Sequence, residues 1–415
     1  MESEPNRTII ILSTEPWGKM LLSKMHFALE LVKKGSKVYF VNPPRDLPGR
    51  ALAVAGETME GGKLTIIHTR TVRGSLFLRH KLFFLYRRLN ARYIRAIRKI
   101  AGGKIAEVWS FNPNQFVDLR PFGADRSVLM LYDFYRGAHI VEATKTADAL
   151  ISVSQVILDH YKDTAPPKLF IHHGLGHYFA DRARRRLGDN EFARAGTGDP
   201  VEAVGTGDPG RAAVGTGDPG TGPIRVGYTG NLLRAGMNTE IAREIISKHA
   251  EIEFHFWGPH SMTDNNVNSV DESPRELLEF VEFLKGQGNV FLHGVVGQQE
   301  LAARLFEMDA FLFMYSSRTE MNGASNAHKL LEYISTGKAI IATHVSSYAG
   351  TDLLEMSEPG EERRLPELFD TVVRELAVYN SPERQIGRIR FALDNTYARQ
   401  VERVQEFIAW RRSVL

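Results

Sequence analysis

Short apolar runs alternate with stretches that favour helix along most of this chain. The first run, TIIIL at residues 8–12, is followed by an expected helix over about residues 22–34. Gly35 suits the end of that helix, and the apolar run KVYFV begins two residues later. Two buried strands joined by a helix form a βαβ unit, so we expect the chain to open with a parallel sheet.

The same alternation starts again at Ile224. The strand-like runs of this second half are IRVGYT, IEFHFW, NVFLHG and DAFLFM, and amphipathic segments separate them. Alternating strands and helices favour parallel sheets with right-handed connections. We therefore predict the α/β class, with two doubly wound, Rossmann-like domains at residues 1–194 and 223–385 and a C-terminal helix at 386–415.

Residues 195–222 interrupt this pattern with three copies of the sequence GTGDP. Glycine, aspartate and proline with almost no large apolar side chain cannot form a core. We expect this segment to be a flexible linker between the two domains that is dispensable for chemistry.

The segment SNAHKLLEYISTGKAIIATHV, residues 325–345, predicts a short helix, a turn and a buried strand. Lys329 and Glu332 lie three residues apart, so they share one side of the helix, opposite its apolar side. Gly337 suits the end of the helix. A cation and a carboxylate in this arrangement suit a sugar nucleotide, with Lys329 at the diphosphate and Glu332 at the ribose hydroxyls.

Glycines follow the predicted strands of the second domain. Gly230, Gly258, Gly294 and Gly323 all come just past a strand end. Ligands of doubly wound sheets bind at this edge, and glycine lets the backbone approach a phosphate group closely. The order of these glycines, together with Lys329, favours a phosphate-containing ligand.

The 325–345 segment resembles the donor-binding signature of glycosyltransferases with the GT-B fold. In that family a basic residue precedes Glu-Ala or Glu-Tyr and a glycine turn, which Lys329, Glu332-Tyr333 and Gly337 match. Ala324 stands where many members have the first glutamate of an E-x7-E motif, so the chain is closer to the branch with an N-K-x-x-E-Y core. The sequence ALDNTYAR resembles the family's terminal helix, which crosses back to the first domain.

The resemblance implies a nucleotide-diphosphate sugar, linked to UDP or GDP, as the co-substrate, with no cofactor and no metal ion. Gly294 and Val295 correspond to the loop that receives the nucleotide base in this family. The implied donor-binding residues are Gly230, Asn231, Gly258, Gly294, Val295, Asn326, Lys329 and Glu332.

The first domain is expected to hold the acceptor and to supply a catalytic base. In the GT-B family the loop after the first strand faces the acceptor, and Trp17, Gly18 and Lys19 occupy that loop here. Asp133 follows the apolar run SVLMLY and should emerge at the carboxyl edge of the sheet, where it also matches a Tyr-Asp loop of the family. We assign Asp133 as the base and Glu15 as the second candidate; alternatively, Asp133 only caps the following turn.

Composition disfavours several other classes. The 415 residues include no cysteine, which excludes disulfides, cysteine ligands and a thiol nucleophile. No G-x-G-x-x-G follows the first strand, which disfavours a nicotinamide enzyme. The N-terminal sequence MESEPNRTIII does not resemble a signal peptide, and the chain has no run of about 18 apolar residues. We expect a cytoplasmic protein.

Charge is distributed unevenly in the first domain. No Asp or Glu occurs between Gly61 and Ala106, while residues 70–104 contain eleven Lys or Arg. An apolar stripe at helical spacing runs from Leu82 to Ile100. This stretch is either a basic amphipathic helix on an anionic membrane, at its inner face, or a core-packed helix with a solvated basic side. No nucleic-acid motif accompanies the charge, so we expect no nucleic-acid partner.

These observations predict a metal-independent glycosyltransferase that moves a sugar from a nucleotide-diphosphate sugar to a glycan or lipid-linked acceptor, in bacterial cell-surface polysaccharide biosynthesis. Two alternatives stay open. A sugar-nucleotide epimerase can share the fold, and a catalytically silent subunit would bind the sugar nucleotide without transferring it.

Overall fold

The computed structural model describes residues 7–18, 21–188, 222–233, 236–261, 275–315 and 327–410. These residues form two compact units: unit 1 contains 7–174 and 395–410, and unit 2 contains the described residues between 175 and 394. The predicted α/β class with two doubly wound domains is confirmed. Of the residues discussed above, Lys19, Gly323, Ala324, Asn326 and the GTGDP repeats lie outside the described residues.

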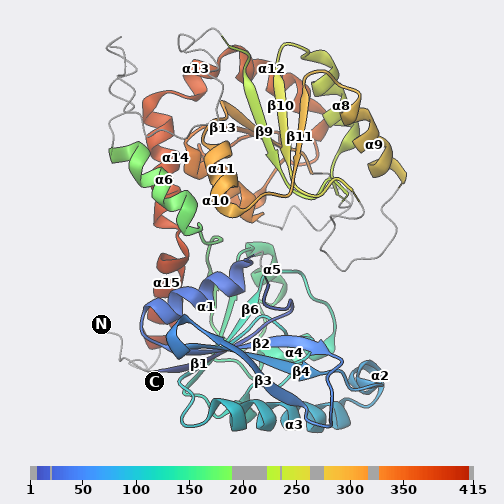
Figure 1. The fold of residues 1–415 in the computed structure, drawn as a ribbon, viewed down its shortest axis with the longest axis vertical. Coiled ribbons are helices and arrows are strands. Elements are labelled where there is room, and N and C mark those ends of the chain that lie inside the picture. The colour runs from blue at the N-terminus through green and yellow to red at the C-terminus, as the bar shows by residue number, and fades with distance from the viewer. Residues whose placement is uncertain are drawn as a thin grey trace, which may run out of the picture. The chain divides into compact units, whose positions relative to one another are not determined.

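The described part of unit 1 contains one sheet, with the strand order β3-β4-β2-β1-β5-β6-β7-β8 (Figure 1). The strands are β1 (Thr8–Leu12), β2 (Lys37–Arg45), β3 (Ala53–Met59), β4 (Leu64–Arg70), β5 (Glu107–Ser110), β6 (Arg126–Leu131), β7 (Ala149–Ser152) and β8 (Lys168–Phe170). All neighbours are parallel except β3 and β4. The order reverses between β1 and β5, so their carboxyl ends mark the switch point of this sheet.

Helices cover both faces of this sheet because its strands are apolar on both sides. The helices are α1 (Ser23–Lys33), α2 (Ser75–Lys81), α3 (Phe83–Ala101), α4 (Ala138–Thr144), α5 (Gln155–His160) and α15 (Tyr397–Trp410). Ile9 and Ile11 pack in the same cluster as α1 and α15, whereas Ile10 and Leu12 pack with α3. Figure 1 shows α1 and α3 on opposite sides of the sheet.

The described part of unit 2 contains a fully parallel sheet with the order β11-β10-β9-β12-β13-β14. The strands are β9 (Arg225–Thr229), β10 (Glu253–Trp257), β11 (Val290–Gly294), β12 (Ala310–Phe313), β13 (Ala339–Ala342) and β14 (Glu355–Met356). The chain runs outward from β9 to β11 and then returns to β12 on the other side of β9. The carboxyl ends of β9 and β12 are therefore the switch point, where ligands of such sheets bind.

The helices of unit 2 divide between the two faces of its sheet. They are α6 (His177–Gly188), α8 (Thr239–Lys248), α9 (Arg275–Lys285), α10 (Gln298–Leu305), α11 (His328–Thr336), α12 (Leu365–Arg374), α13 (Leu376–Tyr379) and α14 (Pro382–Asp394). Residues of α8, α9 and α12 share one core cluster, and residues of α6, α10, α11 and α14 share the other. Within the described residues, no helix is both long and apolar enough to span a bilayer.

The end of the chain forms two helices where the sequence suggested one. α14 belongs to unit 2 and α15 to unit 1, and residues 395 and 396 separate them. The Thr396 hydroxyl accepts a hydrogen bond from the Arg399 N–H at 3.3 Å, which favours a new helix start here. α6 belongs to unit 2, although its residues lie within the predicted first domain.

Candidate functional site

Lys329 lies at the switch point of unit 2. It is the second residue of α11, and its Nζ donates hydrogen bonds to the Thr229 carbonyl and the Tyr315 hydroxyl, both at 2.9 Å. Thr229 is the last residue of β9, and Tyr315 comes two residues after β12. The cation therefore connects the two strand ends between which the sheet reverses its order.

Aromatic rings surround this ammonium group. Nζ lies 4.4 Å from the ring centre of Tyr228, 4.6 Å from that of Tyr315 and 5.2 Å from that of Phe313. Lys329 is only 6% exposed. Cation–π attraction to these rings and the hydrogen bonds fix the Lys329 ammonium group in position before any ligand binds.

Glycines make room for this lysine at the strand ends. Gly230 has a φ of +147°, and a Cβ placed there would lie 2.8 Å from the Lys329 Nζ. Gly258 has a φ of +131°, and its Cβ would lie 2.2 Å from the Gly230 carbonyl oxygen. Both positions therefore require glycine, for conformation and for space.

Backbone hydrogen bonds join the glycines that follow β9 and β10 to the neighbouring strand ends. The Gly230 N–H donates to the Trp257 carbonyl at 2.8 Å, and the Gly258 N–H donates to the Gly294 carbonyl at 2.8 Å. The structure thus brings Gly230, Gly258 and Gly294 together at one edge of the sheet, as predicted. Val295, which follows Gly294, is 54% exposed and presents an apolar surface there.

Glu332 lies three residues after Lys329 on α11 and is partly buried. Burial raises the pKa of Glu332 to about 7, and the charge of Lys329 partly opposes this rise. The neighbouring Tyr333 fixes the helix, because its hydroxyl accepts a hydrogen bond from the Thr229 N–H at 2.6 Å. The carboxyl of Glu332 can therefore change its protonation near neutral pH beside a fixed cation.

Asn231 has a local role in the structure. Its Oδ1 accepts a hydrogen bond from the Leu233 N–H at 2.9 Å, which closes the turn after Gly230. Asn326, the remaining predicted donor residue, lies outside the described residues. Among the described residues, no group of three or more carboxylate or imidazole side chains is arranged to hold a metal ion.

Sequence reasoning missed the aromatic residues around Lys329. Tyr228 belongs to the run VGYTG and Tyr315 to the run FMYSS, so each lies within two residues of a strand end. The sequence did contain a signal for them, namely a tyrosine near the carboxyl end of each strand at the switch point. The sequence analysis also did not select His260. Its ring lies beside Gly294 at this edge, because a Cβ added to Gly294 would lie 3.6 Å from the His260 Cε1.

A second polar cluster occupies the carboxyl edge of unit 1. Lys24, in the first turn of α1, forms an ion pair with Glu15 and donates a hydrogen bond to the Thr14 hydroxyl at 2.7 Å. The Thr14 hydroxyl in turn donates to the Glu15 carboxylate at 2.7 Å. Burial lowers the pKa of Lys24 to about 8, and the negative charge of Asp133 opposes this decrease. Lys24 was not predicted, since a lysine in a helical segment usually lies at the surface.

The two predicted base candidates therefore lie near the same lysine. Asp133 is exposed and follows β6 by two residues, as expected from the apolar run before it. Its charge also contributes to the raised pKa of Tyr135, after the larger effect of burial. Asp133 and Glu15 thus belong to one electrostatic cluster that contains a buried cation.

The predicted acceptor loop begins beside this cluster. The Trp17 backbone N–H donates to the Asn42 Oδ1 at 2.8 Å, and its ring packs edge-on against Phe40 at a centroid distance of 5.0 Å. Trp17 is therefore partly a packing residue. A side chain would have space at Gly18, because the nearest atom to a Cβ added there would be the Pro16 carbonyl oxygen, at 3.9 Å.

A scan against protein-family models and a search of curated proteins gave no match. Among solved structures, sucrose-phosphate synthase from Thermosynechococcus elongatus has a TM-score of 0.64 at 11% identity, over 99% of this chain and 100% of the other. A trehalose-6-phosphate protein from E. coli bound with UDP-2-fluoro glucose has a TM-score of 0.65 at 10% identity, over 97% and 98%.

HepE from Anabaena in complex with UDP is also similar, with a TM-score of 0.59 at 12% identity over 99% of this chain and 100% of that chain. At these identities the likeness establishes the fold, which extends over almost the whole length of each protein. The chain therefore has the GT-B fold of glycosyltransferases, as the donor-site signature predicted.

Proposed function

We propose that this chain is a glycosyltransferase that takes its sugar from a nucleotide-diphosphate sugar, linked to UDP or GDP. The observation that carries the proposal is the buried Lys329, which joins the ends of β9 and β12 by hydrogen bonds at 2.9 Å. A cation at the switch point of a doubly wound sheet suits an anionic ligand such as a diphosphate.

The same groups can stabilise the products of sugar transfer. When the glycosidic bond to the donor breaks, negative charge develops on the leaving diphosphate. Lys329 is already positioned, and the glycines after β9 and β10 leave room for its ammonium group at the strand ends. Fixed charges and dipoles of this kind stabilise a transition state without reorganisation, so we propose that transfer needs no metal ion.

Ligands in similar structures support this donor class. The E. coli structure is described with UDP-2-fluoro glucose, and the HepE structure is described with UDP. For the acceptor, we propose a glycan or lipid-linked molecule of cell-surface polysaccharide biosynthesis, reached at the cytoplasmic face of a membrane. The acid-free basic stretch of unit 1 supports that choice.

The first test is incubation of the purified chain with a panel of UDP- and GDP-sugars. Release of UDP or GDP that increases with a lipid-linked or glycan acceptor supports transfer. Conversion of the donor into its epimer without any acceptor would instead identify an epimerase. Binding with neither reaction would identify a silent subunit, and absence of binding to every sugar nucleotide would refute the proposed donor site.

The affinity for a UDP-sugar should depend on pH through Glu332. Its pKa near 7 means that the carboxylate, which can accept hydrogen bonds from ribose hydroxyls, is formed only as the pH rises through neutrality. We expect calorimetric affinity to increase by about tenfold between pH 6 and pH 8. A UDP-sugar is the suitable probe because its esterified diphosphate does not titrate in this range.

Glu332→Gln should abolish that pH dependence and weaken binding at pH 8 by about 1–3 kcal/mol. The matched control is Glu279→Gln, which removes an exposed carboxylate from α9 of the same unit. An unchanged pH profile in the Glu332 variant would remove this residue from the donor site.

A further inference from the structure

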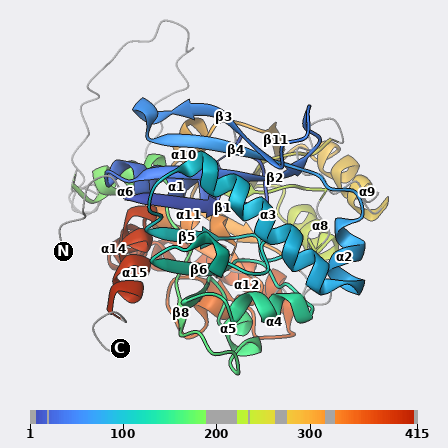
Figure 2. The ribbon, with the colours of Figure 1, turned by 90° about the horizontal axis from the view of Figure 1, so that it is seen from below.

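Large apolar side chains are exposed at one end of unit 1. Leu76 and Phe77 on α2 are 64% and 59% exposed, and Phe84 in the first turn of α3 is 60% exposed. Leu82, between the two helices, is 37% exposed. α2 packs beside the beginning of α3, as Figure 2 shows, so these residues lie on adjacent turns of the chain. Such a concentration of exposed apolar surface indicates an interaction site.

The apolar stripe of α3 does not provide this surface. Tyr93, Ile94 and Ile97 are buried in the core beneath the sheet, and Tyr86 is also buried. The structure thus favours the core-packed alternative for the stripe. The opposite side of α3 is exposed and carries Phe84 and then basic residues at helical spacing, namely Arg88, Arg92 and Arg95.

The charges around the exposed apolar residues are of one sign. Arg73 precedes α2, Lys81 lies one turn after Phe77, and Arg88 lies one turn after Phe84. None of these three forms an ion pair with another described residue. Since residues 61–106 contain no Asp or Glu, their positive charges are not compensated within this segment.

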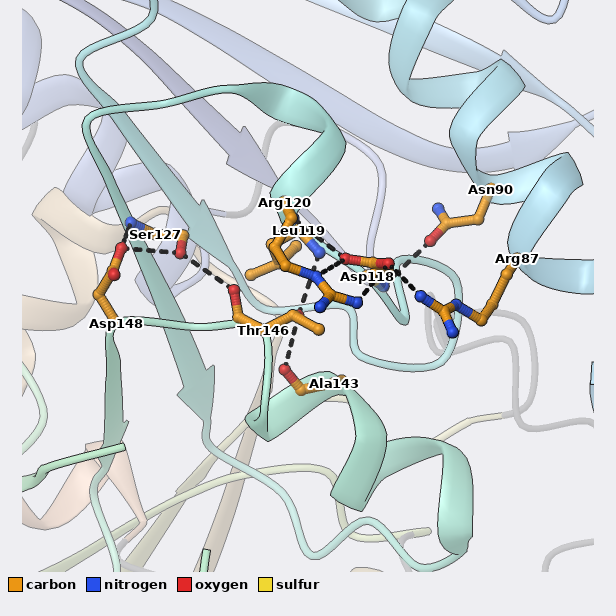
Figure 3. A network of polar contacts seen from close by, with 9 residues as sticks. All are labelled: Arg87, Asn90, Asp118, Leu119, Arg120, Ser127, Ala143, Thr146 and Asp148. Carbon is orange, nitrogen blue, oxygen red and sulfur yellow. Dashed lines mark hydrogen bonds and ion pairs between the residues drawn. The ribbon is translucent and has the colours of Figure 1, made fainter. Parts of the chain in front are cut away.

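Arg87 shows the contrasting case. It forms an ion pair with Asp118 at 2.9 Å, and Arg120 contacts the same carboxylate, also at 2.9 Å (Figure 3). Burial acts to raise the pKa of Asp118, but hydrogen bonds from Arg120 and Arg87 outweigh it and lower that pKa. The network fixes α3 to the loop after β5, because the Asn90 side chain also accepts the Asp118 N–H at 3.1 Å. Arg87 is therefore structural, and the surface-directed charges are those of its neighbours.

We propose that α2 and the first turn of α3 form a docking surface for an anionic lipid bilayer. Leu76, Phe77 and Phe84 would enter the boundary between headgroups and acyl chains, while Arg73, Lys81 and Arg88 contact lipid phosphates. Apolar side chains flanked by basic residues bind membranes by these two contributions together. Nucleic acid would use the charge but gain little from an exposed leucine, so the composition favours a bilayer.

This surface lies near the strand ends at which Asp133 emerges. The Arg79 side chain of α2 donates a hydrogen bond to the Asn114 carbonyl at 2.8 Å, in the loop after β5. His139 of α4, the helix that follows Asp133, makes a hydrogen bond with the Asn114 side chain at 2.9 Å. The role of this docking surface rests on the proposed function, because a bilayer bound here would present a lipid-linked acceptor to this edge of the sheet.

The experiment is co-sedimentation of the full chain with vesicles of phosphatidylcholine, with or without phosphatidylglycerol. Wild type should bind the vesicles that contain phosphatidylglycerol, and added salt should weaken binding. The triple variant Leu76→Ser/Phe77→Ser/Phe84→Ser and the triple variant Arg73→Gln/Lys81→Gln/Arg88→Gln should each lower the partition coefficient at least about tenfold.

Matched controls are available in other parts of the chain. Leu278→Ser/Val378→Ser removes exposed apolar residues from α9 and α13, and Lys162→Gln/Arg185→Gln/Arg363→Gln removes three exposed charges from other surfaces. Both controls should bind vesicles like wild type. Equal loss in test and control variants, equal binding to vesicles with and without phosphatidylglycerol, or binding to RNA but not to vesicles would overturn the inference.

The two proposals can fail separately. Vesicle binding requires no sugar nucleotide, so its absence contradicts the docking surface and leaves the donor site untouched. Binding of a UDP-sugar, measured by calorimetry, should be the same in wild type and in both triple variants, because none of the substituted residues belongs to unit 2.

Discussion

Lys329→Met should lower the turnover of the nucleotide-sugar donor by about 10²- to 10³-fold. Methionine preserves the apolar stem and removes only the cation that now connects the Thr229 carbonyl with the Tyr315 hydroxyl. The negative charge on the diphosphate increases as the sugar departs, so the loss should affect kcat more than donor binding. Steady-state kinetics of UDP or GDP release, combined with calorimetric affinity for the intact donor, separate the two effects.

A control is needed because Lys329 also contributes to the structure around it. Lys285→Met removes an exposed lysine from α9 and should leave kinetics unchanged. Lys329→Arg retains the charge, so it should recover part of the activity if electrostatics is the cause. Normal kcat in a folded Lys329→Met protein, with a wild-type melting curve, would exclude the assigned leaving-group role.

The strands and helices that surround the site could be predicted because their signals are local. The apolar run at residues 8–12 coincides with β1, and the short helix expected within residues 325–345 is α11, His328–Thr336. Its end is well defined because Gly337 adopts a φ of +80°, which glycine accepts without strain. β3 had no comparable signal, since most of its residues are exposed at the edge of the sheet.

The proposed donor site could be predicted further than the proposed acceptor side. Lys329, Gly230 and Gly258 come together because each is placed by its own strand end or helix start. Lys24 depends instead on the approach of α1 to the loop after β1, which no sequence spacing encodes. The same limit applies to Tyr315, whose position relative to Lys329 depends on how β12 pairs with β9.

Amphipathic spacing alone could not decide what the basic helix contacts. A stripe of apolar residues on α3 fits a lipid surface and a protein core equally well, because both bury one side of a helix. Tyr93 and Ile97 are buried in the core of unit 1, and that assignment required the sheet to be present. The exposed residues of α2 were outside the periodic pattern, so periodicity gave no reason to select them.

Asp133→Asn should lower sugar transfer by about 10²-fold or more while leaving donor affinity unchanged. If transfer inverts the anomeric centre, the attacking hydroxyl of the acceptor must lose a proton, and a carboxylate is the usual recipient. Asp133 is exposed two residues after β6, and its charge acts on Lys24, whose pKa burial lowers to about 8. Asparagine keeps the size and turn-forming capacity of aspartate, so a role in capping alone would leave transfer nearly intact.

Glu15 provides the decisive comparison for the base assignment. The Glu15 carboxylate forms an ion pair with Lys24 and accepts a hydrogen bond from the Thr14 hydroxyl. Lys24 and Thr14 therefore both stabilise its negative charge. Glu15→Gln should therefore lower transfer less than Asp133→Asn, since the Glu15 carboxylate is already engaged by two partners, whereas Asp133 is exposed. Transfer rates and UDP-sugar affinities of both variants and of wild type test this order. Near-normal transfer by Asp133→Asn with strong loss in Glu15→Gln would reverse the assignment and make Glu15 the proton acceptor.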